Sequence, residues 1–366
     1  MKTAIVTGAN GFIGAHIVHR LLAQGSCVHA LGRSTATSPW RDRVISALRE
    51  VGDSAELQRK LYCHEVDLNT QGGRLDSSFL TDCLPADTTL YHVAGDTRFT
   101  PLNPDLQRQV NIQATINVVD SLKEKIATAI HVSTAFVAGN RTGLIRESEL
   151  GCGQIFHNDY EKSKFDAEAL LTEYCRKHDV ALIIVRPGII TNDRESGRAS
   201  TFTHLNALVE VISRLQEHYH ISDGEVVSRR IRLMADSEAR PNLAPVDSII
   251  PPLVQIAESS AARGKTFHLC HPNPLSNAQL IGLICDAFQV KGKLALEFLE
   301  SIPKPMSRTE EMILRSLKPY APYLNSRCEF DLNHTRSIVP NYDSYFTRPD
   351  VSYIRKIIEF QRRNRK

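Results

Sequence analysis

A tyrosine and a lysine stand four residues apart in the chain, at Tyr160 and Lys164. Residues i and i+4 lie on one face of a helix, so a helix here would project the phenol and the ammonium together. An adjacent ammonium favours the phenolate and lowers the pKa of a tyrosine, which is about 10 when unperturbed. Tyr160 could then pass a proton to a carbonyl oxygen while the carbonyl carbon accepts hydride. Such a pair also occurs on ordinary helix surfaces, so its interpretation depends on the rest of the chain.

Two adjacent hydroxyl residues, Ser133 and Thr134, follow a short apolar run at 129–132. If that run is a strand of a parallel sheet, both hydroxyls lie at its carboxyl end, which faces the ligand crevice in open α/β folds. The same residue types also serve as turn residues or helix caps. Combined with the tyrosine and the lysine, they favour a catalytic pair over a surface decoration.

Three glycines at intervals of three, Gly8, Gly11 and Gly14, follow an N-terminal apolar run at 4–6. Gly8 allows a tight turn with positive φ, Gly11 lets a phosphate approach bare backbone, and Gly14 lets the next helix pack close to the sheet. A helix at 12–23 would aim its N-terminal amides at a pyrophosphate. The spacing predicts a dinucleotide-binding loop, although a purely structural strand–turn–helix could carry the same glycines.

The second predicted strand ends at Arg33. In a dinucleotide-binding domain an acidic residue at this point binds the 2′-hydroxyl of NAD, whereas an arginine suits the 2′-phosphate of NADP. Arg33, with Arg43 nearby, therefore predicts NADP, and a solvated loop arginine is the alternative. Asp67 and Leu68 follow the third predicted strand, where they could bracket the adenine.

Strands and helices alternate through the first 190 residues. Predicted strands lie at 4–6, 26–32, 61–66, 88–93, 129–132, 180–186 and 266–269, and predicted helices at 12–23, 40–60, 111–119, 160–177, 202–219 and 275–290. This alternation predicts an α/β fold with a Rossmann doubly wound parallel sheet. We assign 1–190 to an NADP-binding domain with later returns near 242–270. The rhythm changes beyond residue 190, so 191–241 and 271–366 are assigned to a smaller, mostly helical C-terminal substrate lobe.

The composition is that of an ordinary globular protein. A net charge of +3 over 366 residues is too small to predict a nucleic-acid or membrane partner. The eight cysteines are scattered without a C-x-x-C pair, which predicts a reducing, cytoplasmic location and argues against a disulfide scaffold or a metal site. No apolar run reaches about 18 residues, so neither a membrane span nor a signal peptide is expected.

The motifs taken together resemble those of an extended short-chain dehydrogenase/reductase. The match rests on Thr7-Gly-Ala-Asn-Gly-Phe-Ile-Gly14, Asp67-Leu68, His92-Val-Ala-Gly95, Asn111, His131-Val-Ser-Thr134, Tyr160-x-x-x-Lys164 and Arg186-Pro187. Within that superfamily the segments at 131–139, 160–168 and 186–190 most resemble the thioester-reductase and fatty-acyl-CoA-reductase branch. Ala138 stands where many sugar-nucleotide members have tyrosine, and the last 70 or so residues match no motif.

The resemblance implies a role for each matching residue. Thr134 would hydrogen-bond the substrate carbonyl, with Ser133 as the second choice, and Tyr160 would donate the proton. Lys164 would hold the nicotinamide ribose and lower the tyrosine pKa, while Asn111 would shape the site. The expected cofactor contacts are Gly8, Asn10, Gly11, Phe12, Ile13, Gly14, Arg33, Arg43, Asp67, Leu68, Ala94, Gly95, Lys164, Pro187, Gly188 and Ile189.

We therefore expect an NADP-dependent reductase whose substrate is an acyl thioester, bound to a carrier or to coenzyme A, or a simpler ketone or aldehyde. Two other functions stay open, a nucleotide-sugar epimerase or dehydratase with tightly bound NAD, and a non-catalytic dinucleotide-binding module. The basic cluster Arg229, Arg230 and Arg232 could receive an acidic carrier protein or a phosphopantetheine phosphate, although a solvated face explains it equally well. Relatives commonly form dimers, which makes a homodimer a further expectation. The acyl group, the extent of reduction and the direction are not encoded in these motifs.

Overall fold

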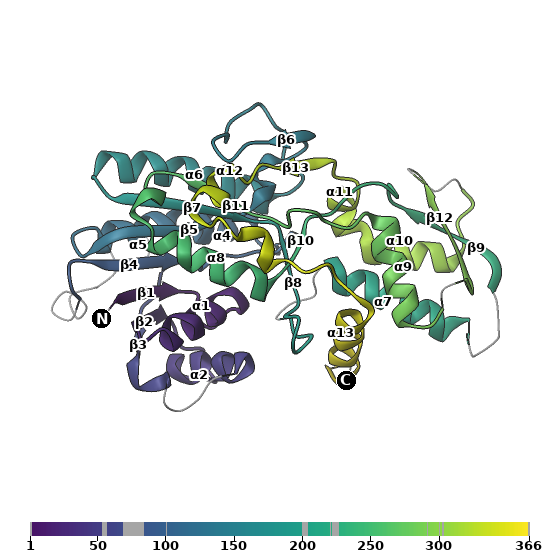
Figure 1. Ribbon diagram of the computed structural model, residues 1–366, viewed down its shortest axis with the longest axis horizontal. Coiled ribbons are helices and arrows are strands. Elements are labelled where there is room, and N and C mark those ends of the chain that lie inside the picture. The colour runs from purple at the N-terminus through teal and green to yellow at the C-terminus, as the bar shows by residue number, and fades with distance from the viewer. Residues whose placement is uncertain are drawn as a thin grey trace.

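The chain forms a sheet domain and a smaller lobe, which lie side by side along the long axis of the molecule (Figure 1). The computed structural model describes residues 2–52, 57–68, 84–99, 101–199, 204–219, 221, 227–290, 292–299, 301 and 304–364. We refer to the two parts as the Rossmann domain and the lobe. Within the described ranges, none of the helices has the length and apolar character needed to cross a membrane.

A seven-stranded sheet, parallel throughout, forms the centre of the Rossmann domain. Its strands are β1 (Thr3–Thr7), β2 (Cys27–Gly32), β3 (Leu61–Glu65), β4 (Thr88–His92), β5 (Ile126–Val132), β7 (Ala181–Pro187) and β11 (Thr266–Leu269). They are ordered β11-β7-β5-β4-β1-β2-β3, so the direction of winding reverses between β1 and β4. Ligands of open α/β sheets bind at such a reversal, beyond the carboxyl ends of the strands. The predicted doubly wound fold is confirmed.

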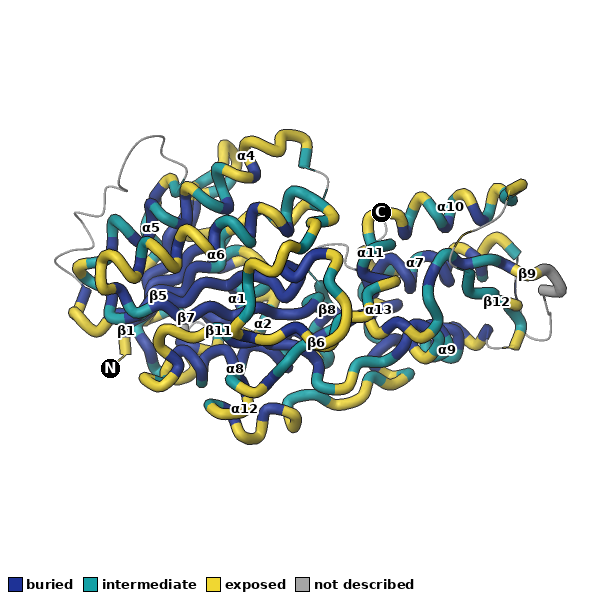
Figure 2. The backbone as a smooth tube through the Cα atoms, turned by 90° about the horizontal axis from the view of Figure 1, so that it is seen from above, coloured by how far each residue is buried: buried dark blue, intermediate teal, exposed yellow. Residues whose placement is uncertain are grey.

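Helices cover both faces of this sheet, and Figure 2 shows the strands buried between them. One face carries α1 (Phe12–Ala23), α2 (Trp40–Val51) and α8 (Val246–Glu258), and the other carries α5 (Ala114–Leu122) and α6 (Asp159–Lys177). Alternate residues of each strand belong to opposite cores: Ala4 and Val6 pack with the first set of helices, and Ile5 packs with the second. Strands buried on both faces explain the near-continuous apolar runs of the sequence.

The lobe is built around a separate apolar core of helices. Its helices are α7 (His204–His218), α9 (Asn277–Ala287), α10 (Arg308–Leu317) and α13 (Val351–Asn364). A pair of parallel strands, β9 (Val227–Met234) and β12 (Leu294–Leu299), packs with them. Ser276 is the N-cap of α9 and forms a capping box with Gln279.

The segment between α10 and α13 does not stay in the lobe, although 271–366 was assigned to it. The chain crosses back over the Rossmann domain before it returns to α13 (yellow in Figure 1). Leu332, Val339 and Tyr342 are buried in the same core as α1 and α8. The hydroxyl of Tyr342 donates a hydrogen bond to the carbonyl of Cys270, 2.8 Å away. Part of the segment between α10 and α13 therefore packs with the Rossmann domain, and not with the lobe to which the sequence analysis assigned it.

The predicted strands all occur, with ends that differ by at most three residues. The helix predicted at 40–60 is wrong beyond residue 51, because Gly52 adopts a left-handed conformation (φ 115°) that ends α2. The remaining elements are η1 (Leu57–Lys60), α4 (Pro104–Arg108), η2 (Gln109–Gln113), η3 (Ala135–Ala138), β6 (Gly143–Ile145), β8 (Ile189–Thr191), β10 (Leu243–Pro245), η4 (Ser260–Ala262), η5 (Lys318–Tyr320), α11 (Ala321–Leu324), β13 (Cys328–Phe330), α12 (Asn333–Ile338) and η6 (Tyr342–Tyr345).

Candidate active site

The glycine loop connects β1 to α1, and at two of its glycines a larger residue would not fit. Gly8 has a φ of +69°, and a Cβ there would lie 2.8 Å from the amide nitrogen of Ala94. A Cβ on Gly14 would lie 2.1 Å from the carbonyl oxygen of Gly8. Gly11 donates its amide hydrogen to the same carbonyl, at 2.9 Å, and so closes the turn. The loop and the first turn of α1 line a cavity, which leaves bare backbone facing the space where a pyrophosphate would lie.

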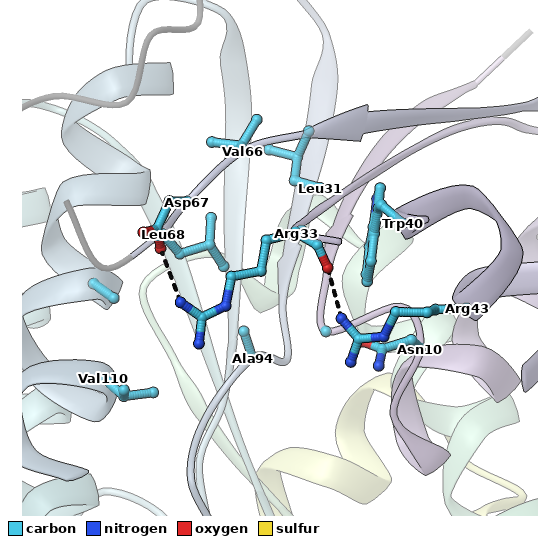
Figure 3. A pocket seen from close by; sticks show the side chains of 13 residues that line it. Asn10, Leu31, Arg33, Trp40, Arg43, Val66, Asp67, Leu68, Ala94 and Val110 are labelled. Atoms are coloured by element: carbon cyan, nitrogen blue, oxygen red, sulfur yellow. Dashed lines mark hydrogen bonds and ion pairs between the residues drawn. The ribbon is translucent and has the colours of Figure 1, made fainter. Parts of the chain in front are cut away.

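A small cavity of about 180 Å³ lies at the carboxyl ends of β2 and β3 (Figure 3). Arg33 reaches across it to Asp67, with 3.6 Å between guanidinium nitrogen and carboxylate oxygen. Arg43 donates a hydrogen bond to the carbonyl of Arg33 at 2.6 Å. Leu68, Asn10 and Ala94 also line this space, so the residues predicted for the adenosine end lie together.

Trp40 is a wall of the same small cavity that the sequence analysis missed. Its indole Nε1 donates to the carbonyl of Ala30 at 3.0 Å, and its ring lies over Gly32. A Cβ on Gly32 would stand 2.5 Å from that ring. The single tryptophan in the chain, seven residues after Arg33, is the signal that could have indicated it.

A larger cavity of about 680 Å³ continues from the glycine loop toward the lobe. Ser133, Thr134 and Tyr160 lie in its wall. The other predicted residues that line it are Gly8, Asn10, Gly11, Phe12, Ile13, Gly14, Ala94, Gly95, Pro187, Gly188 and Ile189. Three distant parts of the chain therefore meet around one space: the loop after β1, the end of β5 and the start of α6.

Thr134 has two roles at the end of β5. Its hydroxyl accepts a hydrogen bond from the amide of Phe136 (3.3 Å) and so caps the short helix η3, as the alternative interpretation expected. Thr134 and Tyr160 line the same cavity, and the interaction between their side chains lowers the pKa of Tyr160. The Ser133 hydroxyl has no partner within the described part of the chain although it is buried. The cap fixes the position of Thr134 so that its oxygen lies beside the phenol.

The pKa of Tyr160 differs from the sequence-based expectation. Burial raises the pKa of Tyr160 to about 12, the interaction with Thr134 opposes this, and the nearby carboxylate of Glu161 adds to it. The expectation that Lys164 lowers this pKa is wrong in this structure, because the ammonium of Lys164 lies against β5 and not beside the phenol. Tyr160 is therefore a neutral phenol at physiological pH, which is the form that can donate a proton.

Lys164 lies beneath the cavity wall and not in it. Its ammonium donates a hydrogen bond to the carbonyl of Val132 at 2.8 Å and lies 3.3 Å from Nε2 of His131. Burial lowers the pKa of Lys164 to about 8, and the carboxylate of Glu168 opposes this shift. Both partners belong to β5, so this contact ties α6 to the strand that carries Thr134.

Asn111 also lies outside the cavity lining. It sits in the π-helix η2, which continues α4, rather than at the start of a regular helix. Its side-chain oxygen accepts from the amide of Asp96 (2.7 Å), and its nitrogen donates to the carbonyl of Asp96 and to the hydroxyl of Ser163, each at 2.9 Å. Asn111 thereby joins the segment after β4 to α6.

Aromatic side chains form the substrate side of the larger cavity. Phe99 contacts Tyr160, with ring centroids 5.9 Å apart, and also contacts Tyr323 at 5.1 Å. Phe136 packs edge-on against Tyr323 at 4.7 Å. Sequence reasoning missed this wall, because its members come from segments more than 200 residues apart and follow no local pattern.

One member of the predicted basic cluster, Arg232, makes a contact within the lobe. Arg232 forms a bidentate ion pair with the buried carboxylate of Glu310, through nitrogen–oxygen contacts of 2.6 and 2.8 Å. Arg230 is exposed and lies 3.9 Å from Glu297, while the side chain of Arg229 falls outside the described residues. Arg232 therefore joins β9 to α10 within the lobe.

The residues present fit a dinucleotide in three respects. The glycine turn leaves no room for side chains, an arginine pair lines the smaller cavity, and a hydroxyl pair lines the larger one, with Gly8, Asn10 and Ala94 lining both. The residues that the structure describes contain no group of three or more His, Cys, Asp or Glu side chains arranged to hold a metal ion.

Comparison with known families assigns the chain. Residues 6–250 match the profile of the NAD_binding_4 family, described as "Male sterility protein". The chain belongs to this family. The match confirms the predicted resemblance to the thioester-reductase and fatty-acyl-CoA-reductase branch, and a probable fatty acyl-CoA reductase of Arabidopsis thaliana is 25% identical over 216 residues, which is 51% of this chain and 43% of that protein. The expectation of an NAD(P)-dependent reductase of the short-chain type is confirmed at the level of the family.

Similar proteins agree with this assignment. The chain is 27% identical over 218 residues to the non-reducing polyketide synthase pkiA of Emericella nidulans, which is 56% of this chain and 8% of that protein. It therefore spans only a small part of that relative.

Solved structures share the fold. The terminal R domain from the myxalamid PKS-NRPS biosynthetic pathway has a TM-score of 0.77 at 20% identity, over 98% of this chain and 90% of that one. A thiolation-reductase di-domain from an archaeal non-ribosomal peptide synthetase has a TM-score of 0.76 at 16% identity, over 99% of this chain and 75% of that one. UDP-glucuronic acid 4-epimerase from Bacillus cereus, in complex with NAD and UDP-glucuronic acid, has 0.67 at 17% identity, over 99% of each.

Proposed function

We propose that this male sterility family protein is an NADP-dependent reductase that reduces the carbonyl group of an acyl thioester, held on a carrier protein or on coenzyme A, to the aldehyde or the alcohol. The observation that carries the proposal is that Thr134 and Tyr160 lie together in the wall of the cavity that starts at the glycine loop. NADP in its reduced form would supply the hydride when bound.

The chain's own residues would bind the carbonyl and provide the proton. Thr134 and Tyr160 can both hydrogen-bond one carbonyl oxygen, and such bonds strengthen as negative charge develops on that oxygen. Tyr160 keeps its proton because burial holds its pKa at about 12, so it can transfer that proton to the oxygen. The Ser133 hydroxyl, buried and without a described partner, is the second candidate for the same oxygen.

The other residues would hold the reactive groups in place. Lys164 would fix α6 against β5 and reach the nicotinamide ribose, and Asn111 would hold the segment after β4. The NADP preference rests on Arg33 and Arg43, whose guanidinium groups lie at the adenosine end. An acyl carrier protein as partner is suggested by the relatives, since one solved neighbour joins a thiolation domain to a reductase domain. A cytoplasmic location and a homodimer stay predictions from the sequence.

The test is NADPH oxidation with a panel of acyl-CoA thioesters, carrier-bound acyl groups and free aldehydes. The proposal expects turnover with at least one thioester, and Tyr160→Phe should lower kcat about 100- to 10,000-fold while NADPH still binds. Full turnover in Tyr160→Phe, or no NADPH consumption with any substrate, would overturn it. Purified protein that carries NAD and converts a nucleotide sugar without net consumption would establish the epimerase alternative.

A further inference from the structure

His204 is a buried histidine whose ring makes no hydrogen bond. It is the first residue of α7 and has 1% of its surface exposed. Neither Nδ1 nor Nε2 has a hydrogen-bond partner in the part of the chain that the structure describes. Buried polar groups in native proteins are nearly always paired, and an unpaired one destabilises the fold. Within the described part of the chain, the two nitrogens of this ring are therefore available to a ligand.

The position of the ring points to a ligand. His204 lies in the wall of the larger cavity, which is the one that Thr134 and Tyr160 also line. Its ring stacks on Tyr320, with centroids 5.7 Å apart and planes 15° from parallel. Tyr320 contacts Phe99 at 6.0 Å, and Phe99 contacts Tyr160. The imidazole is thus held by stacking at a fixed place two rings away from the proton donor.

The chemistry of the cavity defines the partner. Burial lowers the pKa of His204 to about 3, so the ring is neutral and offers one N–H donor and one acceptor nitrogen. Among the described lining residues, Arg98 has the one ionised side chain, and it donates three hydrogen bonds to the carboxylate of Asp96. A carboxylate or phosphate at His204 would meet no opposite charge. A hydroxyl or an amide, each able to donate and accept, matches the neutral imidazole.

We propose that His204 is a substrate-specificity residue that binds a neutral hydrogen-bonding group, a hydroxyl or an amide, placed on the substrate away from the reacting carbonyl. This inference rests on the proposed function, because it deepens the substrate class of the same cavity. The group belongs either to the acyl chain or to the thioester tether. The two sources share their chemistry and are separated by experiment.

The test compares paired thioesters in wild-type protein and in His204→Phe, which keeps the aromatic stack on Tyr320 and removes both nitrogens. One pair is octanoyl-CoA and 3-hydroxyoctanoyl-CoA, which differ in the acyl chain alone. The other is the octanoyl thioester of N-acetylcysteamine and that of pentanethiol, which has the same chain length in the tether and lacks the amide. His204→Gln keeps a donor and an acceptor, and His218→Phe makes the same type of change at the exposed far end of α7.

In one of the pairs, wild-type kcat/KM should favour the member with the polar group about 10- to 100-fold. His204→Phe should reduce that ratio to near one, His204→Gln should restore part of it, and His218→Phe should leave it unchanged. Without ligand, His204→Phe should unfold at the same temperature as wild type or higher, because two unpaired buried nitrogens are removed. A packing role would instead slow both members of a pair equally.

Equal ratios in wild type and His204→Phe for both pairs would overturn the inference while the proposed function stands. Absence of turnover with all four thioesters in wild type would count against the proposed function. The same compounds would then be compared as ligands, by the rise in unfolding temperature that each causes in the presence of NADP. An equal rise in both proteins would overturn the inference, and a rise lost only in His204→Phe and only for the polar members would support it.

Discussion

Replacement of Arg33 tests the predicted preference for NADP. Its guanidinium lies 3.6 Å from the Asp67 carboxylate, and both side chains are more than half exposed, at 62% and 54%. An exposed ion pair contributes at most about 1 kcal/mol, so Arg33 can exchange Asp67 for a phosphate at small cost. A charge-assisted hydrogen bond to the 2′-phosphate contributes about 1.5–3 kcal/mol. After loss of the ion pair, the net gain of about 1–2 kcal/mol corresponds to roughly 5- to 30-fold in affinity.

The assay is titration of nicotinamide fluorescence with NADPH and with NADH. Arg33→Ala should weaken NADPH binding roughly 5- to 30-fold and leave NADH binding nearly unchanged, because NADH carries no 2′-phosphate. Asp67→Asn should tighten NADPH binding up to about 5-fold, since it removes the competing carboxylate. Arg49→Ala, an exposed arginine in the last turn of α2, is the matched control. Equal weakening of both cofactors in Arg33→Ala, or weaker NADPH binding in Asp67→Asn, would refute the reasoning.

Three more changes have defined outcomes. The pKa of Lys164 is about 8, so its ammonium loses its charge as the pH rises through that value. Loss of the charge should weaken the proposed contact with the nicotinamide ribose, and reduction should therefore slow above about pH 8. Lys164→Arg keeps its charge and should lose this fall in the pH profile of kcat/KM, so the same fall in both proteins would contradict the role of the charge. Glu168→Gln leaves Arg186 buried without its bidentate partner and should lower the free energy of unfolding in urea by about 3–5 kcal/mol, whereas exposed Glu173→Gln should change it by less than about 0.5. Gly14→Ala should abolish NADPH binding or destabilise the fold, because its Cβ meets the Gly8 carbonyl, while Gly282→Ala in α9 has open space and should stabilise by up to about 1 kcal/mol; binding in Gly14→Ala as tight as in wild type would contradict the steric argument.

The local parts of the site were predictable from the sequence. The turn at Gly8, the helix at 12–23 and the shared face of Tyr160 and Lys164 depend on residues within a few positions of one another. Hydrophobic periodicity also located the strands, because a strand buried on both faces is apolar along most of its length. Since parallel strands place their carboxyl ends at one edge, the predicted parallel sheet already placed Thr134 and the glycine loop at the same edge.

The tertiary structure decided what each of these residues contacts. The ammonium of Lys164 was expected beside the phenol, and it instead donates a hydrogen bond to the carbonyl of Val132 in β5. The pKa of the Tyr160 phenol is raised by burial, which depends on the surrounding groups and not on spacing along the helix.

The sequence by itself therefore determined the fold, the cofactor loop and the family, because each depends on short-range pattern. The structure alone brought His204, Tyr320 and Phe99 together from the lobe and from the segment after β4, and placed Arg33 against Asp67. It also returned residues 328–346 to the Rossmann core. Contacts between segments far apart in the chain follow from how two packed units meet. Burial exists only after that packing is complete, and it sets the pKa values of the site. It also encloses the ring nitrogens of His204, which have no partner among the described residues.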